Sequence, residues 1–503
     1  MKDRKRYNII FVHPDLGIGG AERLILDAAL ALQARGHKIT IYTSHRDKSH
    51  CFEEARDGTL DVRVHGDKLF PAHIRGRFHV LMAILRQLSL IYYLSESTST
   101  ANNNDDEMHD IFIVDQVPAC VPVLRALRDL AARRKTQKQR TLFYCHFPDQ
   151  LLARRGEGGM ALRALKMIYR YLFDWFEGWA MSAADRIVVN SRFTGGVVRE
   201  VFGNTGEDVQ VVYPCVDTGR RTKDVSVAKV DDGGELWGGL KILLSINRFE
   251  RKKNIELALH AYHGIAEEDR KGTRLVIAGG YDNRVSENVH YHKELDALAT
   301  RLGFQTATSK TVVSAMSVPD SINVLFLLSV PSAFKETLLS SSSLLLYTPS
   351  YEHFGIVPVE AMYAGLPVLA DNTGGPLETV VEGKTGWLRS SKEISGWTEV
   401  INYVLHRMSS TERLDMAAFA KQRVEKEFSL HAMGERLQQQ IDEMVQAEDR
   451  AFLPLTVILG LGLVFGVRIV KTSEVDKQMP STTAQGKSEH KSMCSMACHC
   501  VHS

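Results

Sequence analysis

The sequence predicts an α/β protein of two facing, Rossmann-like doubly wound domains with a C-terminal membrane segment. Short apolar runs alternate with amphipathic segments in two regions of the chain, which indicates parallel sheets covered by helices on both faces. Residues 215–240 lie between these regions and have the composition of a linker. The length of 503 residues suits two or three domains of about 100–200 residues each.

The first region, 1–214, opens with a basic N-terminus and an apolar run that is too short for the core of a signal peptide. This run predicts a strand over Asn8–His13. Apolar residues at helical spacing then predict a helix over Ala21–Arg35, which ends at Gly36. Further buried strands are expected at His37–Thr43, Ile111–Val114, Thr141–Cys145 and Arg186–Val189.

Two segments of the first region are less regular. His73–Leu94 combines large apolar residues with three arginines, and two alternatives stay open for it: a core helix, or an amphipathic helix lying in a membrane interface. The stretch Ser95–Glu107 is rich in Ser, Thr, Asn and Asp, which predicts a surface loop.

The second region, 241–446, repeats the alternation of strand and helix. Ligands of doubly wound sheets bind at the carboxyl ends of the strands, so two facing domains place a cleft between them. Strands are expected at Lys241–Ile246, Arg274–Ala278, Val324–Leu328, Leu344–Tyr347 and Pro367–Ala370, and helices at Ile255–Ile265, Phe334–Ser340 and Val357–Ala364.

Composition limits the function classes. The chain has 62 basic and 60 acidic residues, a net charge of +2, which argues against a nucleic-acid-binding protein. Four of its seven cysteines are scattered singly through the body of the chain, which indicates reduced structural thiols rather than a disulfide framework. These four are Cys51, Cys120, Cys145 and Cys215.

The C-terminal part carries the candidate membrane segment. Ala451–Val467 contains no charge, and the apolar run continues to Val470 across Arg468, which predicts a transmembrane or membrane-associated helix over 451–470. A buried terminal helix is the alternative. We expect the tail, 471–503, to be disordered; its Cys494, Cys498 and Cys500 leave metal binding or acylation open.

Two short motifs follow strands. Gly17-Ile-Gly19-Gly20-Ala-Glu22 is a glycine-rich turn that either lets a phosphate approach a helix N-terminus or is a tight turn without a ligand. It lacks the third glycine and the later acidic residue of a dinucleotide fingerprint, which disfavours NAD. Arg248 and Lys253 follow the strand ending at Ile246, where they form either a diphosphate clamp or a basic surface turn.

The strongest motif spans 349–368. Glu352 and Glu360 are eight residues apart and bracket a predicted strand-to-helix turn that contains Phe354, Gly355 and Ile356. A carboxylate for sugar hydroxyls, a helix N-terminus for phosphates and a second carboxylate for a ribose would occur in this order.

This E-x7-E element, with the glycine-rich turn and the Arg248/Lys253 pair, resembles glycosyltransferase family 4, whose members have the GT-B fold. The segments 13–23, 144–152, 189–194 and 213–215 resemble more closely the mannosyltransferases of that family that act on dolichol-linked oligosaccharides. The resemblance covers about Tyr7 to Phe428.

The resemblance implies a role for each motif residue. Arg248 and Lys253 would stabilise the leaving diphosphate, and Glu352 would contact the donor sugar. The remaining donor contacts would come from Gly19 and Gly20 near the reaction centre, from Phe354, from the backbone of Gly355 and Ile356, and from Glu360 on the ribose; His146 would lie across the cleft near the sugar. Acceptor binding would fall to the first domain.

The resemblance also implies the reaction. A retaining enzyme would transfer mannose from GDP-mannose to Man1GlcNAc2-pyrophosphate-dolichol, first in α-1,3 and then in α-1,6 linkage. Because the sequence contains no Asp-x-Asp, we expect no metal and no other cofactor. We expect an endoplasmic-reticulum membrane location with the catalytic domains facing the cytosol, and other mannosyltransferases of the pathway as partners.

Two other functions stay open. One is a family-4 glycosyltransferase with another nucleotide-sugar donor or another lipid acceptor. The other is a non-catalytic glycan-binding module on the same fold, against which the intact Arg248, Lys253, Glu352 and Glu360 argue.

Overall fold

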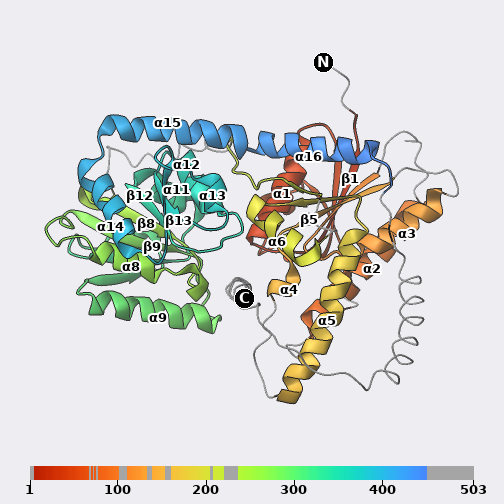
Figure 1. Ribbon diagram of the computed structural model, residues 1–503, viewed down its shortest axis with the longest axis horizontal. Helices are drawn as coiled ribbons and strands as arrows, with labels where there is room; N and C mark the ends of the chain where they lie inside the picture. The colour runs from red at the N-terminus through yellow and green to blue at the C-terminus, as the bar shows by residue number, and fades with distance from the viewer. Residues whose placement is uncertain are drawn as a thin grey trace, which may run out of the picture.

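The computed structural model describes residues 5–66, 70–71, 73–74, 78–100, 110–132, 139–152, 160–203, 208–219, 236–449 and 452. Two seven-stranded sheets with entirely parallel pairing form two α/β domains side by side (Figure 1). The strand orders are β3-β2-β1-β4-β5-β6-β7 and β10-β11-β9-β8-β12-β13-β14. In each sheet the order reverses beside the first strand, β1 or β8, which is where ligands of such sheets bind.

The first domain contains strands β1 (Asn8–Leu16), β2 (Lys38–Arg46), β3 (Asp61–Val64), β4 (Asp110–Asp115), β5 (Arg140–Cys145), β6 (Arg186–Val189) and β7 (Val209–Val211). Its helices are α1 (Gly20–Gln33), α2 (His79–Thr100), α3 (Val121–Ala132), α4 (Asp149–Leu152), α5 (Met160–Ser182) and α6 (Arg192–Phe202). Side chains of β1 alternate between two cores: Ile9 and Phe11 pack on one face of the sheet, and Ile10 and Val12 on the other.

The second domain contains strands β8 (Lys241–Ile246), β9 (Thr273–Gly279), β10 (Thr306–Ser309), β11 (Val324–Leu328), β12 (Leu344–Tyr347), β13 (Val368–Asp371) and β14 (Gly386–Arg389). Its helices are α8 (Glu256–His263), α9 (Ser286–Arg301), α10 (Val312–Met316), α11 (Ser332–Ser341), α12 (Ile356–Tyr363), α13 (Pro376–Thr379), α14 (Ile394–Asn402) and α15 (Ser410–Glu427). Two apolar cores again cover the two faces of the sheet.

Helix α2 is a core helix, the first of the two alternatives for its segment. Met82, Leu90, Ile91 and Leu94 are buried, and the helix packs on β1 and β2. The predicted surface loop is wrong in its first part, because α2 continues to Thr100. Its Ser- and Thr-rich end prolongs the helix at a modest cost in helix propensity, which an established helix tolerates.

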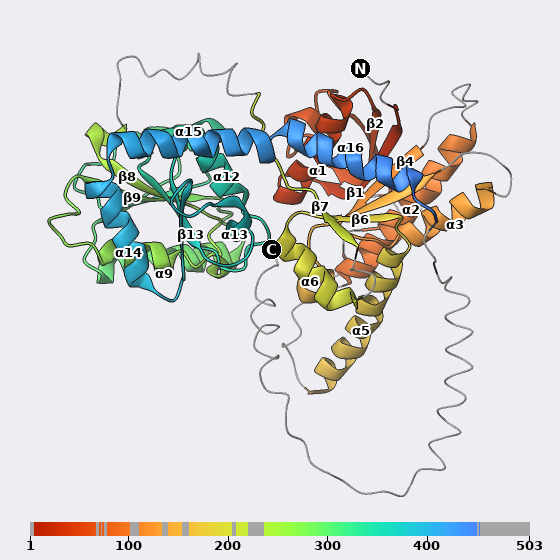
Figure 2. The ribbon, with the colours of Figure 1, turned by 45° about the horizontal axis from the view of Figure 1, so that its top comes forward.

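The last helix that the structure describes, α16 (Leu430–Gln446), returns to the first domain. In both views α15 and α16 run in succession from the second domain to the first, and in Figure 1 they lie along the top of the two domains (Figures 1 and 2). Met433, Leu437 and Ile441 of α16 are buried in the core that also contains α1. The sequence order predicts that residues 241–446 form the second domain, but the apolar face of α16 packs on the first domain.

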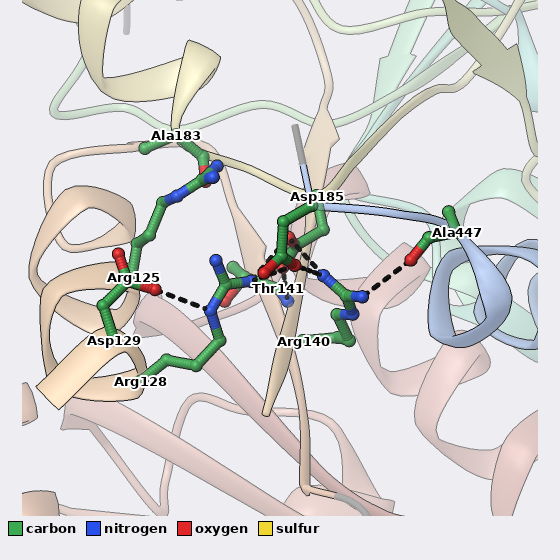
Figure 3. Close-up of polar contacts among 9 residues, drawn as sticks. Arg125, Arg128, Asp129, Arg140, Thr141, Ala183, Asp185 and Ala447 are labelled. Carbon is green, nitrogen blue, oxygen red and sulfur yellow. Dashed lines mark hydrogen bonds and ion pairs between the residues drawn. The ribbon is translucent and has the colours of Figure 1, made fainter. Parts of the chain in front are cut away.

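A buried polar cluster fixes the chain beyond α16 to the start of β5 (Figure 3). Asp185 accepts hydrogen bonds from Nη1 of Arg128 at 2.7 Å, from the backbone N–H of Thr141 at 2.8 Å and from Nη1 of Arg140 at 3.2 Å. Nη2 of Arg140 donates to the carbonyl of Ala447 at 2.7 Å. The buried carboxylate therefore has several donors, and one arginine joins it to the C-terminal segment.

The structure tests the prediction for the cysteines, but it describes almost none of the predicted membrane segment. The four singly scattered cysteines, Cys51, Cys120, Cys145 and Cys215, are free and buried, as predicted. Among the described residues, no helix is both long and apolar enough to cross a membrane. The predicted membrane segment, 451–470, lies outside the described residues except for Phe452, and the tail with Cys494, Cys498 and Cys500 lies entirely outside them.

Candidate active site

A pocket of about 110 Å³ opens at the carboxyl ends of β8 and β12, beside the point where the second sheet reverses its order. Its walls come from the turn after β8 and from the turn between β12 and α12. The lining residues are Arg248, Lys252, Lys253, Ser350, Tyr351, Glu352 and His353. The structure thus brings together Arg248, Lys253 and Glu352, which the sequence singled out separately.

Lys253 and Glu352 form the central ion pair of this pocket. Nζ of Lys253 lies 2.5 Å from Oε2 of Glu352, and their side chains are 14% and 22% exposed. Burial alone would raise the pKa of Glu352, but the Lys253 ammonium lowers it to about 2. The carboxylate is therefore ionised at neutral pH, and a cation stands beside it at the pocket wall.

Arg248 and Lys252 share a buried carboxylate. Nη1 of Arg248 lies 2.8 Å from Oε1 of Glu250, and Nζ of Lys252 lies 3.0 Å from Oε2. Glu250 is only 2% exposed, whereas the Arg248 side chain is 52% exposed. Glu250 thus holds Arg248 and Lys252 in place, while the Arg248 guanidinium remains accessible to an anion.

The turn that carries Glu352 is held by close backbone contacts. Tyr351 has a φ of 53°, and its N–H donates to Oγ1 of Thr373 at 2.8 Å. The Gly375 N–H donates to the Glu352 carbonyl at 2.7 Å. Gly374 has a φ of +68°, and a Cβ there would lie 2.5 Å from the Glu352 carbonyl oxygen, so only glycine fits. Hydrogen bonds and a close backbone contact therefore fix the turn in one conformation, as is common where a side chain must keep one position.

Helix α12 presents its N-terminus beside this turn. Gly355 is the N-cap with a φ of 83°, and no side chain caps the helix, so the first N–H groups, including that of Ile356, remain available. A Cβ on Gly355 would lie 3.2 Å from the ring of Tyr347. Such an end favours an anion.

Glu360 lies one turn further into α12. Its Oε1 accepts a hydrogen bond from Nζ of Lys335 at 2.7 Å. Its Oε2 is buried and has no hydrogen-bond partner among the described residues. An unpartnered buried carboxylate oxygen is costly and suits an acceptor for a ligand hydroxyl.

Phe354 lies in the core and not among the residues that line the pocket. It is 4% exposed and packs in the core, with its ring 5.8 Å from those of Tyr213 and Phe428. Its side chain stabilises the turn by packing in the core, while its neighbours Glu352 and His353 line the pocket.

Three polar residues converge at the carboxyl ends of β1, β4 and β5 in the first domain. Nδ1 of His13 lies 2.8 Å from Oδ1 of Asp115, and Nε2 of His146 lies 3.0 Å from Oδ2 of the same carboxylate. Asp115 and His13 are 1% and 0% exposed, and the His146 side chain is 17% exposed. Gln116, directly after Asp115, has a φ of 59°.

The glycine-rich turn stands at the end of β1 in the same domain. Gly19 is the N-cap of α1 with an extended φ of −158°, and Gly20 is the exposed first residue of the helix. A Cβ on Gly19 would lie 2.3 Å from the Glu22 carboxylate, whereas one on Gly20 would meet nothing within 4 Å. Space beside this helix end is therefore available at Gly20.

The two domains contact each other beside both constellations. The ring of Phe147, next to His146, stacks on that of His353 with centroids 3.9 Å apart. Oγ of Ser191 donates to the His353 carbonyl at 2.5 Å. Burial lowers the pKa of His353 to about 4, so this ring is neutral at physiological pH. The His146 loop and the Glu352 turn thus meet through one aromatic pair.

Helix α6 of the first domain is capped by the second domain. Oε2 and Oε1 of Glu378 accept the backbone N–H groups of Arg192 and Phe193, each at 2.8 Å. Oε2 also accepts the hydroxyl of Tyr213 at 3.0 Å. One carboxylate from α13 therefore holds three donors of the first domain and the segment that follows it.

Sequence reasoning missed His13, Asp115, Lys335 and Glu378 as parts of the site. His13 and Asp115 stand at the ends of buried strands, a position that could have marked them. No local signal marks Lys335 or Glu378. In the part of the chain that the structure describes, no three His, Cys, Asp or Glu side chains are grouped so that they could hold a metal ion.

Two family models and several solved structures are similar to this chain. The family described as glycosyl transferases group 1 matches residues 233–423, and Glycosyltransferase Family 4 matches residues 18–220. Among solved structures, a sucrose-phosphate synthase from Thermosynechococcus elongatus superposes with a TM-score of 0.61 over 88% of this chain and 100% of that one, at 16% identity. WaaG, a glycosyltransferase of lipopolysaccharide biosynthesis, gives 0.55 over 87% and 100%, also at 16% identity. Fold and site therefore define a glycosyltransferase with the GT-B fold.

Curated relatives show which family of glycosyltransferases the chain resembles in sequence. An α-1,3/1,6-mannosyltransferase of Neurospora crassa is 48% identical over 89% of this chain and 92% of its own length. The ALG2 enzyme of Rhizomucor pusillus is 41% identical over 92% and 97%, and that of Saccharomyces cerevisiae 40% over 90% and 88%. The chain belongs to this ALG2 family of α-1,3/1,6-mannosyltransferases.

Proposed function

We propose that this enzyme transfers mannose with retention from GDP-mannose to Man1GlcNAc2-pyrophosphate-dolichol, adding an α-1,3 and then an α-1,6 mannose. Family membership supports the sugar and the two linkages. The observation that carries the donor site is the sequence of groups around α12: the Lys253–Glu352 pair, the uncapped helix start and the unpartnered oxygen of Glu360.

These groups match the parts of a nucleotide sugar. The diphosphate fits between the Arg248 guanidinium, the Lys253 ammonium and the first N–H groups of α12. Glu360 accepts from a ribose hydroxyl through its free oxygen, and Glu352 accepts from hydroxyls of the mannose. His146 faces the sugar from the first domain.

The chemistry needs stabilisation of the leaving group. As the bond from mannose to phosphate breaks, negative charge develops on the β-phosphate of GDP, and fixed cations and N–H dipoles aimed at it lower the barrier. Retention follows if the departing phosphate accepts the proton of the incoming acceptor hydroxyl on the same face of the sugar. Because Arg248, Lys253 and α12 supply the positive potential, we propose that transfer requires no metal.

We further propose that the enzyme works on the cytosolic face of the endoplasmic-reticulum membrane, attached through residues 451–470. The exposed apolar side chains of Tyr171, Leu172 and Trp175 support an additional contact of α5 with lipid. This helix projects beyond the body of the first domain (Figures 1 and 2). A lipid-linked acceptor and an attached enzyme share one surface, which raises their effective concentration.

The test is transfer by the purified full chain. GDP-mannose and Man1GlcNAc2-pyrophosphate-dolichol should give products one and then two hexoses larger, with linkages identified by linkage-specific mannosidases. UDP-glucose and UDP-N-acetylglucosamine should give none. Transfer from another donor, or to another lipid only, would establish the alternative glycosyltransferase; binding of glycan without transfer would establish a binding module. Activity should persist in EDTA, and loss that manganese restores would refute metal independence.

A further inference from the structure

His13 is surrounded by acceptors on both sides of its ring. Nδ1 lies 2.8 and 2.9 Å from the two carboxylate oxygens of Asp115, and Nε2 lies 3.0 Å from the backbone carbonyl of Asp15. A neutral imidazole carries a single N–H and could satisfy only one of these contacts. At a fully buried position, a lone pair facing an oxygen would be repelled with no water to relieve it.

His37 shows the opposite arrangement in the same domain. Its Nδ1 accepts the backbone N–H of Tyr7 at 3.1 Å, and its Nε2 faces Oε1 of Gln438. One nitrogen must therefore be a lone pair and the other an N–H, which is the neutral ring. Burial lowers the pKa of His37 accordingly. The two buried histidines thus differ in the chemistry of their partners, and this difference sets their protonation.

We propose that His13 is held as an imidazolium and, through Asp115, fixes His146 in the neutral tautomer whose Nδ1 lone pair is left for a ligand. His13 and Asp115 then form a buried pair without net charge. His146 donates its Nε2–H to Oδ2 of Asp115, at 3.0 Å. His13 and Asp115 act as positioning residues, because neither reaches the cleft.

The surroundings of the pair favour this assignment. Burial alone would lower the pKa of His13, but the Asp115 carboxylate raises it overall, and Glu22 on α1 adds to this effect. Arg86 on α2 does not face the ring, because it binds the Asp15 carboxylate at 2.8 Å. The charge nearest to His13 is therefore negative.

The turn after Asp115 is itself held in place. Nε2 of Gln87 on α2 donates to the Val117 carbonyl at 2.6 Å, and Oε1 of Gln87 accepts the Cys120 N–H at 2.9 Å. With Gln116 in the left-handed region, the carboxylate leaves β4 in one fixed direction. Helix α2 thus supports both the Asp15 and the Asp115 ends of the cluster.

The consequence for the reaction rests on the proposed function. His146 can then accept a hydrogen bond from a hydroxyl of the donor sugar through Nδ1, but it cannot donate one there. Among the described residues Nδ1 of His146 has no hydrogen-bond partner, and His353 is the titratable ring that faces it from the second domain.

The first test is nitrogen NMR of the full chain labelled with 15N-histidine, in detergent micelles. Between pH 6.5 and 8.5, His13 should show two protonated ring nitrogens, and the signal should vanish in His13→Asn, which assigns it. His37 should show one protonated nitrogen, assigned with His37→Asn. A neutral His13 over this range would overturn the proposal. This measurement needs no donor substrate, so its result stands even if the enzyme proves to use a sugar other than mannose.

The second test is the pH profile of kcat/KM for mannose transfer. In His13→Asn, the Asn amide can still donate to Asp115, but the positive charge is lost, and Asp115 is left as a buried carboxylate without a balancing cation beside His146. The acidic limb should shift upward by about one pH unit or more, as is usual for a close unbalanced charge. His37→Asn is the matched control, with reduced stability and an unshifted limb. An equal loss at all pH values in His13→Asn, with no shift, would show a merely structural role.

Discussion

At the residue scale, Lys253 is the side chain with two electrostatic partners. In the structure it balances the carboxylate of Glu352, and in the proposed donor complex it also stands beside the diphosphate. Its removal would then leave Glu352 as an uncompensated negative charge facing the phosphates. Arg248 differs, because Glu250 anchors it from a buried position while its guanidinium stays half exposed.

We expect Lys253→Ala and Arg248→Ala each to lower kcat/KM by roughly 100-fold or more, since losing one donor to a developing anion costs about 2.7–4 kcal/mol. Initial rates at several GDP-mannose concentrations measure this. Arg251→Ala is the matched control, because this neighbour lies on the same turn but pairs with Glu294 at the surface. Near-normal turnover and donor affinity in either variant would refute the phosphate clamp.

Acid unfolding tests the same ion pair. The pKa of Glu352 is lowered from its usual 4.5 to about 2, so its contribution to stability is fully present above pH 4.5 and is lost as the pH falls toward 2. In Lys253→Met, burial prevails and the pKa rises. We expect the midpoint of acid unfolding, followed by circular dichroism, to lie at higher pH than in wild type. An unchanged or lower midpoint would mean that the pair does not stabilise the fold.

At the element scale, the N-terminus of α6 depends on the other domain. Ser191 caps it locally, since its hydroxyl accepts the Thr194 N–H at 3.0 Å, while Glu378 supplies a second cap from α13. Separation of the domains would leave these N–H groups to water. The same contact therefore caps a helix and joins the two domains.

We expect Glu378→Ala to favour an open arrangement, because a lost cap costs about 0.5–2 kcal/mol. The radius of gyration in small-angle scattering should increase and KM for both substrates should rise. Glu382→Ala is the control, since Glu382 pairs with Arg389 within the second domain. If Glu378→Ala kept the wild-type scattering curve, the cap would not control closure.

The sequence predicted the bounds of strands better than it predicted contacts between residues that are far apart in the chain. The strands over 241–246 and 324–328 were predicted within a residue because burial on both faces of the sheet leaves runs that are almost wholly apolar, interrupted only by Ser245. The partners of His13 and of Phe193 could not be predicted, because Asp115 and Glu378 are 102 and 185 residues away in the chain. Only the folded sheets bring such strand ends and turns together.

At the scale of the whole molecule, the predicted membrane segment follows the two catalytic domains in the chain. Phe452 packs against Trp179, with ring centroids 5.6 Å apart, and lies 5.3 Å from the Arg125 guanidinium. A truncation that spares the fold should therefore keep Phe452 and remove only the residues beyond it.

We expect deletion of 453–503 to weaken membrane attachment and spare the chemistry. Transfer to a long-chain dolichol acceptor in liposomes should fall more than transfer to a short, soluble acceptor, because the shared surface no longer concentrates the enzyme. Deletion of 471–503, which keeps the predicted segment, is the control. An equal loss on both acceptors would mean that the segment belongs to the fold.

The return of α16 to the first domain has a consequence for biosynthesis. Gly434 approaches α1 so closely that a Cβ would lie 3.2 Å from the Ala31 carbonyl, and Asp442 accepts the Tyr7 hydroxyl at 2.6 Å. The ribosome completes the first domain's strands by residue 211 but reaches α16 only more than 200 residues later. At about 5–20 residues per second, the nascent chain exposes an uncovered apolar face for roughly 10–40 s. During this interval the N-terminal half needs protection by chaperones, although it comes first from the ribosome.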